Sequence, residues 1–413
     1  MSGFVRFFSY ALAVVLALSG AASAAELSGW AEVEGRYFPE GPLYRGQESE
    51  SVSVALRPEF YGEWAGDNSF TFVPFYRYDS ADTQRTHFDI REAMFLKAGE
   101  SYEFRAGVGK VFWGVTEANH LVDIINQTDL VESIDGEEKL GQPMVDLTLL
   151  SRYGTWDIFV LPYFRERTFP GRAARLRFDP FIDSDLGAAY ESGDEERHVD
   201  FALRYSNTVG DWDVGVSYFY GTSRDPAYLP RTGTGASFVP FYEIIHQGGL
   251  DVQYVKGGWL WKLEGIYRTG YRDGGYYALD AGFEYTFSGP AFYGMDVGLL
   301  LEYLYDSRNF DFDLNGLVDS GYISSRFNTF MNNDYMLGLR VAVNDAASSE
   351  ILIVATRDAD NGAAVVKIES SRRIGDNWKA ELDGYLFVDA GKDPLLDFFR
   401  KDGFVQASIR YYF

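Results

Sequence analysis

Oxygen-bearing side chains cluster in the segment "DFDLNGLVDS", where their alternate spacing matches the first half of a calcium-binding loop. Gly316 permits the turn that such a loop needs, but position twelve of the pattern is Tyr322 instead of the glutamate that binds through both oxygens. Two interpretations stay open, a bound Ca²⁺ ion or an ordinary turn, and the sequence indicates no other cofactor. The candidate ligands are Asp311, Asp313, Asn315 and Asp319.

A second candidate segment, residues 113–143, is both acidic and apolar. Its apolar side chains, among them Leu121, Ile124 and Ile125, need cover that a freely solvated loop does not give. What covers them depends on the fold, which also decides where the carboxylates of this segment point. These carboxylates are Glu117, Asp123, Asp129 and Glu132.

Two further sets of charges recur at regular places in the chain. One arginine occurs in each of the first five segments in which apolar and polar residues alternate: Arg36, Arg57, Arg77, Arg91 and Arg105. Carboxylates hold the equivalent positions in two later segments: Asp280, Glu284, Asp296 and Glu302. Facing walls of opposite charge would orient water and polar solutes in a channel, whereas charges that only pair with their neighbours would fill space.

The alternating segments are the elements that must position these charges. They recur from Gly29 to the C-terminus, and a period of two is typical of strands with two chemically different faces. In "VDFALRY", Phe201 and Leu203 oppose Asp200 and Arg204. The last such segment runs to Phe413, and a strand at the very end of a chain must be paired. The pattern predicts an all-β, antiparallel, up-and-down transmembrane barrel.

The connections between these segments support a barrel of about eighteen strands, with sixteen as the alternative. Eight short turns alternate with longer connections, near residues 39–50, 79–86, 113–143, 165–196, 221–248, 306–330 and 389–402. In barrels of this class, short turns lie at the periplasmic end and long loops outside the cell, so both termini are expected to be periplasmic. Glu92 falls on the lipid-facing parity, which predicts a bulge in its strand.

Composition and the N-terminus place the protein outside the cytoplasm. Residues 1–24 have the cation, the short apolar stretch and the A-x-A ending of a cleaved secretory signal peptide, which leaves residues 25–413 as one domain. The chain has no cysteine, so disulfides and thiolate metal sites are excluded. Its net charge of −24 argues against nucleic acid as a partner, and its 17% aromatic content is typical of barrels with aromatic girdles.

Within a barrel, the acidic and apolar segment at residues 113–143 has two possible places. It either folds against the inner wall and narrows the pore, or forms a short helix packed on the rim. A later arginine group in an outside loop could bind lipopolysaccharide phosphates or anionic solutes, or be solvated surface. Its members are Arg165, Arg167, Arg172, Arg175 and Arg177. None of the four histidines has a serine at the spacing of outer-membrane lipases, so no enzyme is predicted.

The stretches "GKVFWGVTEANHLVDIINQTDLVESIDGEEKLGQPMVDLTLL", "LEYLYDSR", "NNDYMLGLRVAVNDAASSEIL" and "SSRRIGDNWKAELDGYLF" resemble segments of uncharacterised proteobacterial outer-membrane, porin-like proteins. The terminal "RYYF" is similar to the aromatic signal by which such barrels are recognised by the assembly machinery, with Phe413 as its last residue. The resemblance implies the fold and a place in the Gram-negative outer membrane, among lipids and lipopolysaccharide, but no ligand-binding residue.

Three hypotheses on function follow. The first is a passive channel for small hydrophilic solutes, anionic ones among them, selected by size and by the field between the two charged walls. The second is a channel for export or uptake of an acidic polysaccharide. The third is a plugged, non-conducting barrel with a structural or receptor role. A homo-oligomer is compatible with each of them, and the sequence does not choose a solute or its charge.

Overall fold

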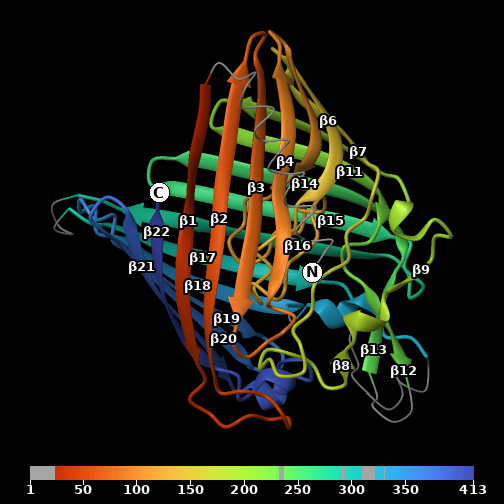
Figure 1. The fold of residues 1–413 in the computed structure, drawn as a ribbon, viewed down its shortest axis with the longest axis vertical. Coiled ribbons are helices and arrows are strands. Elements are labelled where there is room, and N and C mark those ends of the chain that lie inside the picture. Colours follow the sequence, from red (N-terminus) through yellow and green to blue (C-terminus); the bar gives the residue numbers. More distant parts are fainter. Residues whose placement is uncertain (1–23, 232–236, 290–293, 309–320, 330) are drawn as a thin grey trace.

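The computed structural model describes residues 24–231, 237–289, 294–308, 321–329 and 331–413. Eighteen antiparallel strands in these ranges form one sheet that closes on itself, because β1 pairs with β22 as well as with β2 (Figure 1). The predicted barrel of eighteen strands is confirmed. Its strands are β1 (Ala24–Tyr37), β2 (Glu50–Trp64), β3 (Asn68–Asp79), β4 (His87–Ala98), β5 (Tyr102–Gly109), β6 (Gln142–Ser151), β7 (Gly154–Leu161), β10 (Asp200–Val209), β11 (Trp212–Thr222), β14 (Ile244–Lys256), β15 (Trp259–Thr269), β16 (Tyr276–Phe287), β17 (Asp296–Asp306), β18 (Asn333–Ala342), β19 (Glu350–Asp358), β20 (Ala364–Ile374), β21 (Trp378–Val388) and β22 (Phe404–Tyr412).

The two faces of the sheet differ as the alternation predicts. Outward side chains are apolar and exposed, for example Val54, Leu203 and Leu301. Inward side chains are polar or charged, and many of them are buried, for example Asp146 and Asp251. A closed sheet leaves no strand edge unpaired, so the apolar outer surface can meet lipid without exposing backbone hydrogen-bonding groups.

All eight predicted short turns lie at one end of the barrel and join successive strands there. The strand ends that the seven predicted long loops connect all lie at the other end. Two connections at this second end, residues 270–275 and 359–363, are also short. Length alone therefore does not mark the side of a connection, although every long loop is on the same side.

The chain termini meet at the seam of the barrel. Gly29 and Phe413 exchange two backbone hydrogen bonds, with N···O distances of 3.2 and 3.1 Å, so the last residue is part of the closed sheet. Residues 1–23, which hold most of the predicted signal peptide, are outside the described residues, and β1 begins at Ala24. In the described part of the chain, no helix has the length and apolar character that a helical membrane span requires.

The irregularity expected at Glu92 is present. The pairing of β3 with β4 shifts by one residue, so that Val73 lies opposite Glu92 and Pro74 lies opposite Ile90. Arg91 is the extra residue of this bulge. Because the parity changes here, Arg91 and Glu92 both turn inward, away from the lipid-facing surface.

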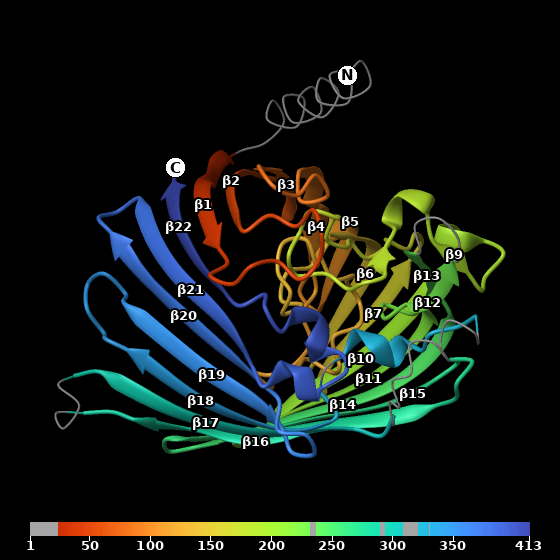
Figure 2. The same ribbon diagram turned by 90° about the horizontal axis from the view of Figure 1, so that it is seen from below.

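Several long loops form a cap over one side of the opening. Four short strands, β8 (Phe181–Ile182), β9 (Ala189–Tyr190), β12 (Ala227–Arg231) and β13 (Ser237–Tyr242), make a small second sheet. In Figure 2, β9, β12 and β13 lie on the side of the opening opposite to β20 and β21. Short 3₁₀ helices complete the loops: η1 (Ser184–Leu186), η2 (Glu195–Arg197), η4 (Ser325–Asn328), η5 (Ala390–Lys392) and η6 (Leu396–Phe399).

Candidate functional site: the lumen and its constriction loop

The connection between β5 and β6, residues 110–141, lies inside the barrel, and we call it the constriction loop (Figure 2). Glu264, an inward residue of β15 on the opposite wall, binds the first part of the constriction loop. One carboxylate oxygen accepts hydrogen bonds from the backbone N–H groups of Val115 and Thr116, at 2.6 and 3.0 Å, and from the Thr116 hydroxyl. The other oxygen accepts from the N–H of Val122 at 3.1 Å. The inward position predicted for this segment is confirmed, and the alternative of a helix on the rim is wrong.

Glu302 of β17 is a second anchor for the same part of the loop. It accepts hydrogen bonds from the backbone N–H groups of Glu117, at 2.8 Å, and Ala118, at 2.8 Å. The Glu117 side chain continues to Arg340 of β18, at 2.8 Å, and approaches Lys262 of β15, at 3.7 Å. Two residues predicted from the sequence, Glu117 of the loop and Glu302 of the acidic wall, are therefore brought together.

The middle of the constriction loop is bound to β3 and β4, two strands that precede the loop in the chain. Asp129 is fully buried and pairs with Arg91 of β4, with an N···O distance of 2.6 Å. Glu132 pairs with Arg77 of β3 at 2.9 Å. In both pairs, a loop carboxylate meets an arginine of the predicted basic wall, so the charges compensate one another in the interior.

The tip of the constriction loop reaches the strands near the C-terminus. Asp135 accepts hydrogen bonds from the Lys367 ammonium of β20, at 2.8 Å, and the Tyr385 hydroxyl of β21, at 2.7 Å. Burial alone would raise the pKa of Asp135, but Lys367 and the hydrogen bonds to Ser133 and Tyr385 outweigh it and lower the pKa to about 2. The carboxylate is thus charged at neutral pH. The loop spans the lumen between three separate parts of the wall.

The loop is also packed by its own residues. Val122, Ile124 and Ile125 are buried in a core with Trp113 and Phe159, which gives the apolar side chains the cover that they need. Asp123 pairs with Lys139 across the loop at 3.3 Å, and its burial raises its pKa. This packing gives the loop one defined conformation, because its apolar residues are buried and its charged residues are paired at the same time.

The arginines of the predicted basic wall lie among carboxylates. Arg77 contacts Glu32 and Glu34 of β1 at 3.1 and 3.4 Å, in addition to Glu132. The others are placed as follows: Arg36 binds Gln406 at 2.7 Å, Arg57 lies opposite Trp30 in the pairing of β1 with β2, Arg91 also binds Asp89 at 3.0 Å, and Arg105 binds Glu103 at 2.7 Å. Neighbour pairing is thus a main role of these inward arginines.

The four carboxylates of the predicted acidic wall have different surroundings. Glu284 approaches Arg340 at 3.9 Å, and Asp296 lies at the strand end, where it accepts a hydrogen bond from Asn344 at 3.0 Å. Asp280 is fully buried between Glu264 and Glu302, and neither of its oxygens has a hydrogen-bond partner within the described residues. The wall is therefore partly an anchor for the loop and partly solvent-exposed surface.

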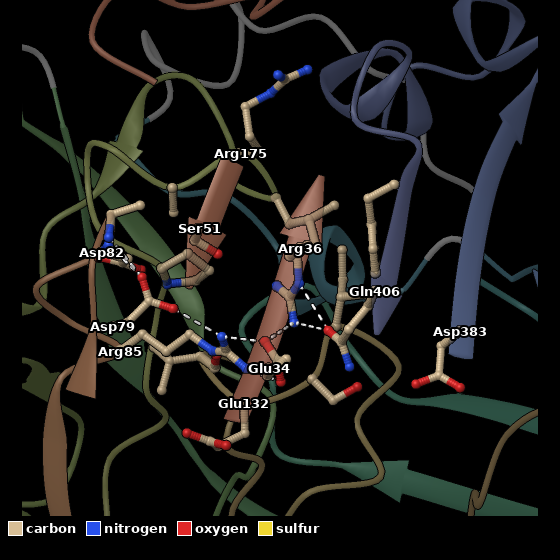
Figure 3. A pocket seen from close by; sticks show the side chains of 18 of the residues that line it. Glu34, Arg36, Ser51, Asp79, Asp82, Arg85, Glu132, Arg175, Asp383 and Gln406 are labelled. Atoms are coloured by element: carbon tan, nitrogen blue, oxygen red, sulfur yellow. Dashed lines mark hydrogen bonds and ion pairs between the residues drawn. The ribbon is translucent and has the colours of Figure 1, made fainter. Parts of the chain in front are cut away.

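Two polar cavities remain beside the constriction loop. One, of about 290 Å³, follows β1, β21 and β22 from Phe38 and Phe404 down to Arg410 and is shown in Figure 3. Six residues separate Phe404 from Arg410, so the lining of this cavity on β22 extends over about 20 Å along the strand. The other, of about 520 Å³, lies between the loop and β15 to β20. Both are lined by Asp135 and Tyr385, so both reach the tip of the loop.

The later arginine group joins loops together. Arg167, Arg175 and Arg177 are buried, so these three are not solvated surface. The members pair with carboxylates: Arg165 with Asp89 at 2.8 Å, Arg167 with Asp225 at 2.8 Å, Arg172 with Asp183 at 3.8 Å, Arg175 with Asp402 at 2.8 Å and Arg177 with Asp179 at 3.4 Å. Burial raises the pKa of Asp402 to about 6 although Arg175 opposes this shift.

The calcium pattern at Asp311, Asp313, Asn315 and Asp319 lies outside the described residues. Within the residues that are described, no group of three or more histidine or acidic side chains is arranged to hold a metal ion. His120, in the constriction loop, binds Glu137 at 3.1 Å.

Sequence reasoning did not single out Glu264, Lys367 or Arg340 as functional residues. Their parity identifies them as inward residues, but that property is common to half of every strand. What distinguishes them is contact with a loop that comes from a different part of the chain, and no local pattern records such a contact.

Among solved structures, a BenF-like porin from Pseudomonas fluorescens Pf-5 is similar to the chain, with a TM-score of 0.54 and 10% sequence identity over 94% of this chain and 97% of that one. A mutant of Rh. blastica porin has 13% identity over 94% of this chain and 100% of that one, with a TM-score of 0.44. No protein-family model and no curated sequence matches the chain. The chain therefore has a porin-like barrel fold.

Proposed function

We propose that the protein is a channel for passive diffusion of small hydrophilic solutes across the Gram-negative outer membrane. The observation that carries this proposal is the pair of polar cavities that remain beside a loop fixed across the lumen. Charged and hydroxyl side chains line both cavities, and such a lining replaces part of the hydration shell of a polar solute but not that of an apolar one. The loop sets the size limit.

Conductance tests the proposal. The mature chain, residues 25–413, is refolded in detergent, checked for heat-modifiable migration in gel electrophoresis, and inserted into a planar bilayer in KCl. Stable open steps are the expected result. Folded protein that inserts but carries no current would contradict the proposal.

A plugged barrel is the second candidate, and the cross-bracing of the constriction loop favours it. The loop is bound to β3, β4, β15, β17, β18, β20 and β21, so it does not swing aside without breaking several ion pairs. In a plugged barrel the two cavities are closed chambers. Absence of current from the whole chain, together with current from a chain whose loop is deleted, would favour this candidate.

An acidic polysaccharide is a less favoured cargo. A polyanion needs donors that are available to it along the lumen, whereas Arg77 and Arg91 each bind two or more carboxylates of the chain itself. Proposed partners are outer-membrane lipids, lipopolysaccharide and, through Phe413, the barrel-assembly machinery. A homo-oligomer stays a proposal, to be tested by cross-linking in native membranes.

A further inference from the structure

The cavity in Figure 3 has a marked surplus of negative charge. Thirteen carboxylates and five arginines line it. All five arginines are already bound by the chain: Arg36 to Gln406 at 2.7 Å, Arg77 to Glu132 at 2.9 Å, Arg85 to Glu34 at 2.7 Å, Arg175 to Asp402 at 2.8 Å and Arg410 to Glu32 at 2.5 Å. The second cavity, with eight carboxylates and six lysine or arginine residues, is also negative but closer to balance.

Within this cavity, the strand register places two carboxylates side by side. Glu369 of β20 and Asp383 of β21 are direct cross-strand partners, and both face the cavity. Asp383 is in turn paired with Gln406 of β22, and Gln406 with Arg36 of β1, so this row holds two adjacent carboxylates before its first cation. Lys367, which binds Glu369 at 2.8 Å, is shared with Asp135 at the same distance.

Two like charges placed directly opposite each other on neighbouring strands destabilise a sheet unless a cation lies between or beside them. In the described part of the chain, no cationic side chain is within 4 Å of the Asp383 carboxylate, and Figure 3 shows Asp383 across the cavity from Arg85. Lys367 offsets only part of this charge, because it is shared with Asp135, so the Glu369–Asp383 pair keeps a net negative charge that faces the cavity. This observation is independent of the overall charge of the lining.

We infer that the channel selects small cationic solutes over anionic ones, and that Glu369 and Asp383 are residues that set this selectivity. The inference rests on the proposed channel function and names the class of solute. The class comprises monovalent inorganic cations and small organic molecules that carry an ammonium group. The chain's paired arginines neutralise part of the wall, and the remaining carboxylates focus a negative potential along the path.

The reversal potential across a KCl gradient tests the inference. For the mature chain at low ionic strength, the expected permeability ratio of K⁺ to Cl⁻ is on the order of 10, the low end of the enrichment that charged clefts produce. In 1 M KCl, where the Debye length is about 3 Å, the ratio should approach one. Replacing Cl⁻ by gluconate should preserve most of the current, because K⁺ carries it, and should preserve more of it than replacing K⁺ by the bulkier choline.

The double variant Asp383→Asn, Glu369→Gln locates the effect. Its permeability ratio should fall at least about twofold relative to the parent, because the variant removes two negative charges from the lining of a narrow path. Asp376→Asn, on an exposed short turn, is the matched control and should leave the ratio unchanged. Heat-modifiable migration should be the same for all three proteins, since the double variant relieves a repulsion and breaks one lysine contact.

The three possible outcomes of these measurements test different parts of the inference. A conducting parent with anion preference or no preference would overturn the inference and leave the channel function intact. Cation preference that survives in the double variant would overturn the assignment to Glu369 and Asp383. Absence of current from folded parent protein would overturn the proposed function and, with it, this inference.

Discussion

The constriction loop and the cap are built from long connections at the same end of the barrel, yet different interactions hold them. The loop is fixed to the wall by carboxylates, through Glu264, Glu302 and Asp135. The cap has an aromatic core in which Tyr228, Phe238 and Phe327 are fully buried. The difference follows from the surroundings. A segment inside a charged lumen meets polar partners, whereas loops stacked on one another can bury rings.

The two regions should therefore respond differently to the solution. Interactions between charges depend on pH and on salt, so the position of the constriction loop depends on both. An aromatic core responds to neither over the same range, so the buried rings should keep the cap in place even where its ion pairs, such as Arg175 with Asp402, weaken. Five changes test this difference, and they are taken in order of decreasing size.

Removal of the constriction loop should have the largest effect. Residues 115–139 are replaced by a short Gly-Ser linker between β5 and β6, and single-channel conductance is measured. We expect a several-fold increase, because the loop spans the lumen between three parts of its wall. An unchanged conductance would mean that the loop is not the narrowest part of the path.

Phe327→Ala should disrupt the cap. The ring is fully buried against Phe178, Tyr228 and Phe238, and truncation of a buried phenylalanine costs about 3–5 kcal/mol. Limited proteolysis should cut the cap of the variant faster while heat-modifiable migration of the barrel is retained. Leu186→Ala, at an exposed position of the cap, is the control and should cut like the parent. Equal rates for both variants would contradict an aromatic core as the main support.

Glu264→Ala should release the first part of the constriction loop. The variant loses an acceptor of four hydrogen bonds, and we expect local destabilisation of about 2–4 kcal/mol. Hydrogen exchange at residues 115–122 should accelerate, and current noise should increase. Glu264→Gln keeps the shape and should have a smaller effect, while Glu100→Gln, on an exposed turn, should have none. Exchange equal to that of the parent would remove Glu264 as an anchor.

Acidification should release the tip of the loop at Asp135. Its pKa in the folded protein is about 2, below the value of about 3.9 for a free aspartate, so the folded state binds fewer protons between these values. The stabilising contribution of the pair with Lys367, about 1–2 kcal/mol, is complete above about pH 4 and is lost as the pH falls toward 2. The protection of the backbone amides of residues 134–136 against hydrogen exchange, corrected for the intrinsic pH dependence of exchange, should be constant from pH 8 to 4 and fall below it.

Asp135→Asn is the variant that isolates this step. It lacks the charge at every pH, so it should show the acid behaviour of the loop tip already at neutral pH. A parent whose loop tip loses this protection between pH 8 and 5 would contradict the assignment, because Asp135 does not titrate in that range.

Asp280→Leu should have the smallest effect, and in the opposite direction. The carboxyl is buried without a hydrogen-bond partner in the described structure, and a buried polar group in that state costs about 1–3 kcal/mol. Its replacement by an apolar side chain of similar size should raise the temperature of heat modification slightly. A lower temperature would indicate that Asp280 has a partner, such as a water molecule or a cation, that contributes to stability.

Most of the fold could be predicted from the sequence, because the residue pattern of a membrane barrel can be recognised within each strand and each turn. Lipid on one face and water on the other impose a period of two on every strand, and the turn residues divide the strands. Even the irregularity at Glu92 was visible, because a charge on the lipid-facing parity signals a shifted register. The candidate site was less accessible. The apolar residues of the loop showed that it needs cover but left the inner wall and the rim both open, and the carboxylate of Glu264 that holds it is one inward charge among many.

Residue types and their spacing along the chain already specify the closed sheet, the end at which the long loops lie, the inward arginines and the acidic surplus. Each of these properties can be recognised within one strand or one turn. Which charges meet is settled only in three dimensions: Arg77 with Glu132, Arg91 with Asp129, Lys367 with Asp135, and Glu369 beside Asp383. These pairs depend on the register of neighbouring strands and on the course of a loop across the lumen. Electrostatic energy depends on distance in space, and alternation along a chain carries no information about that distance.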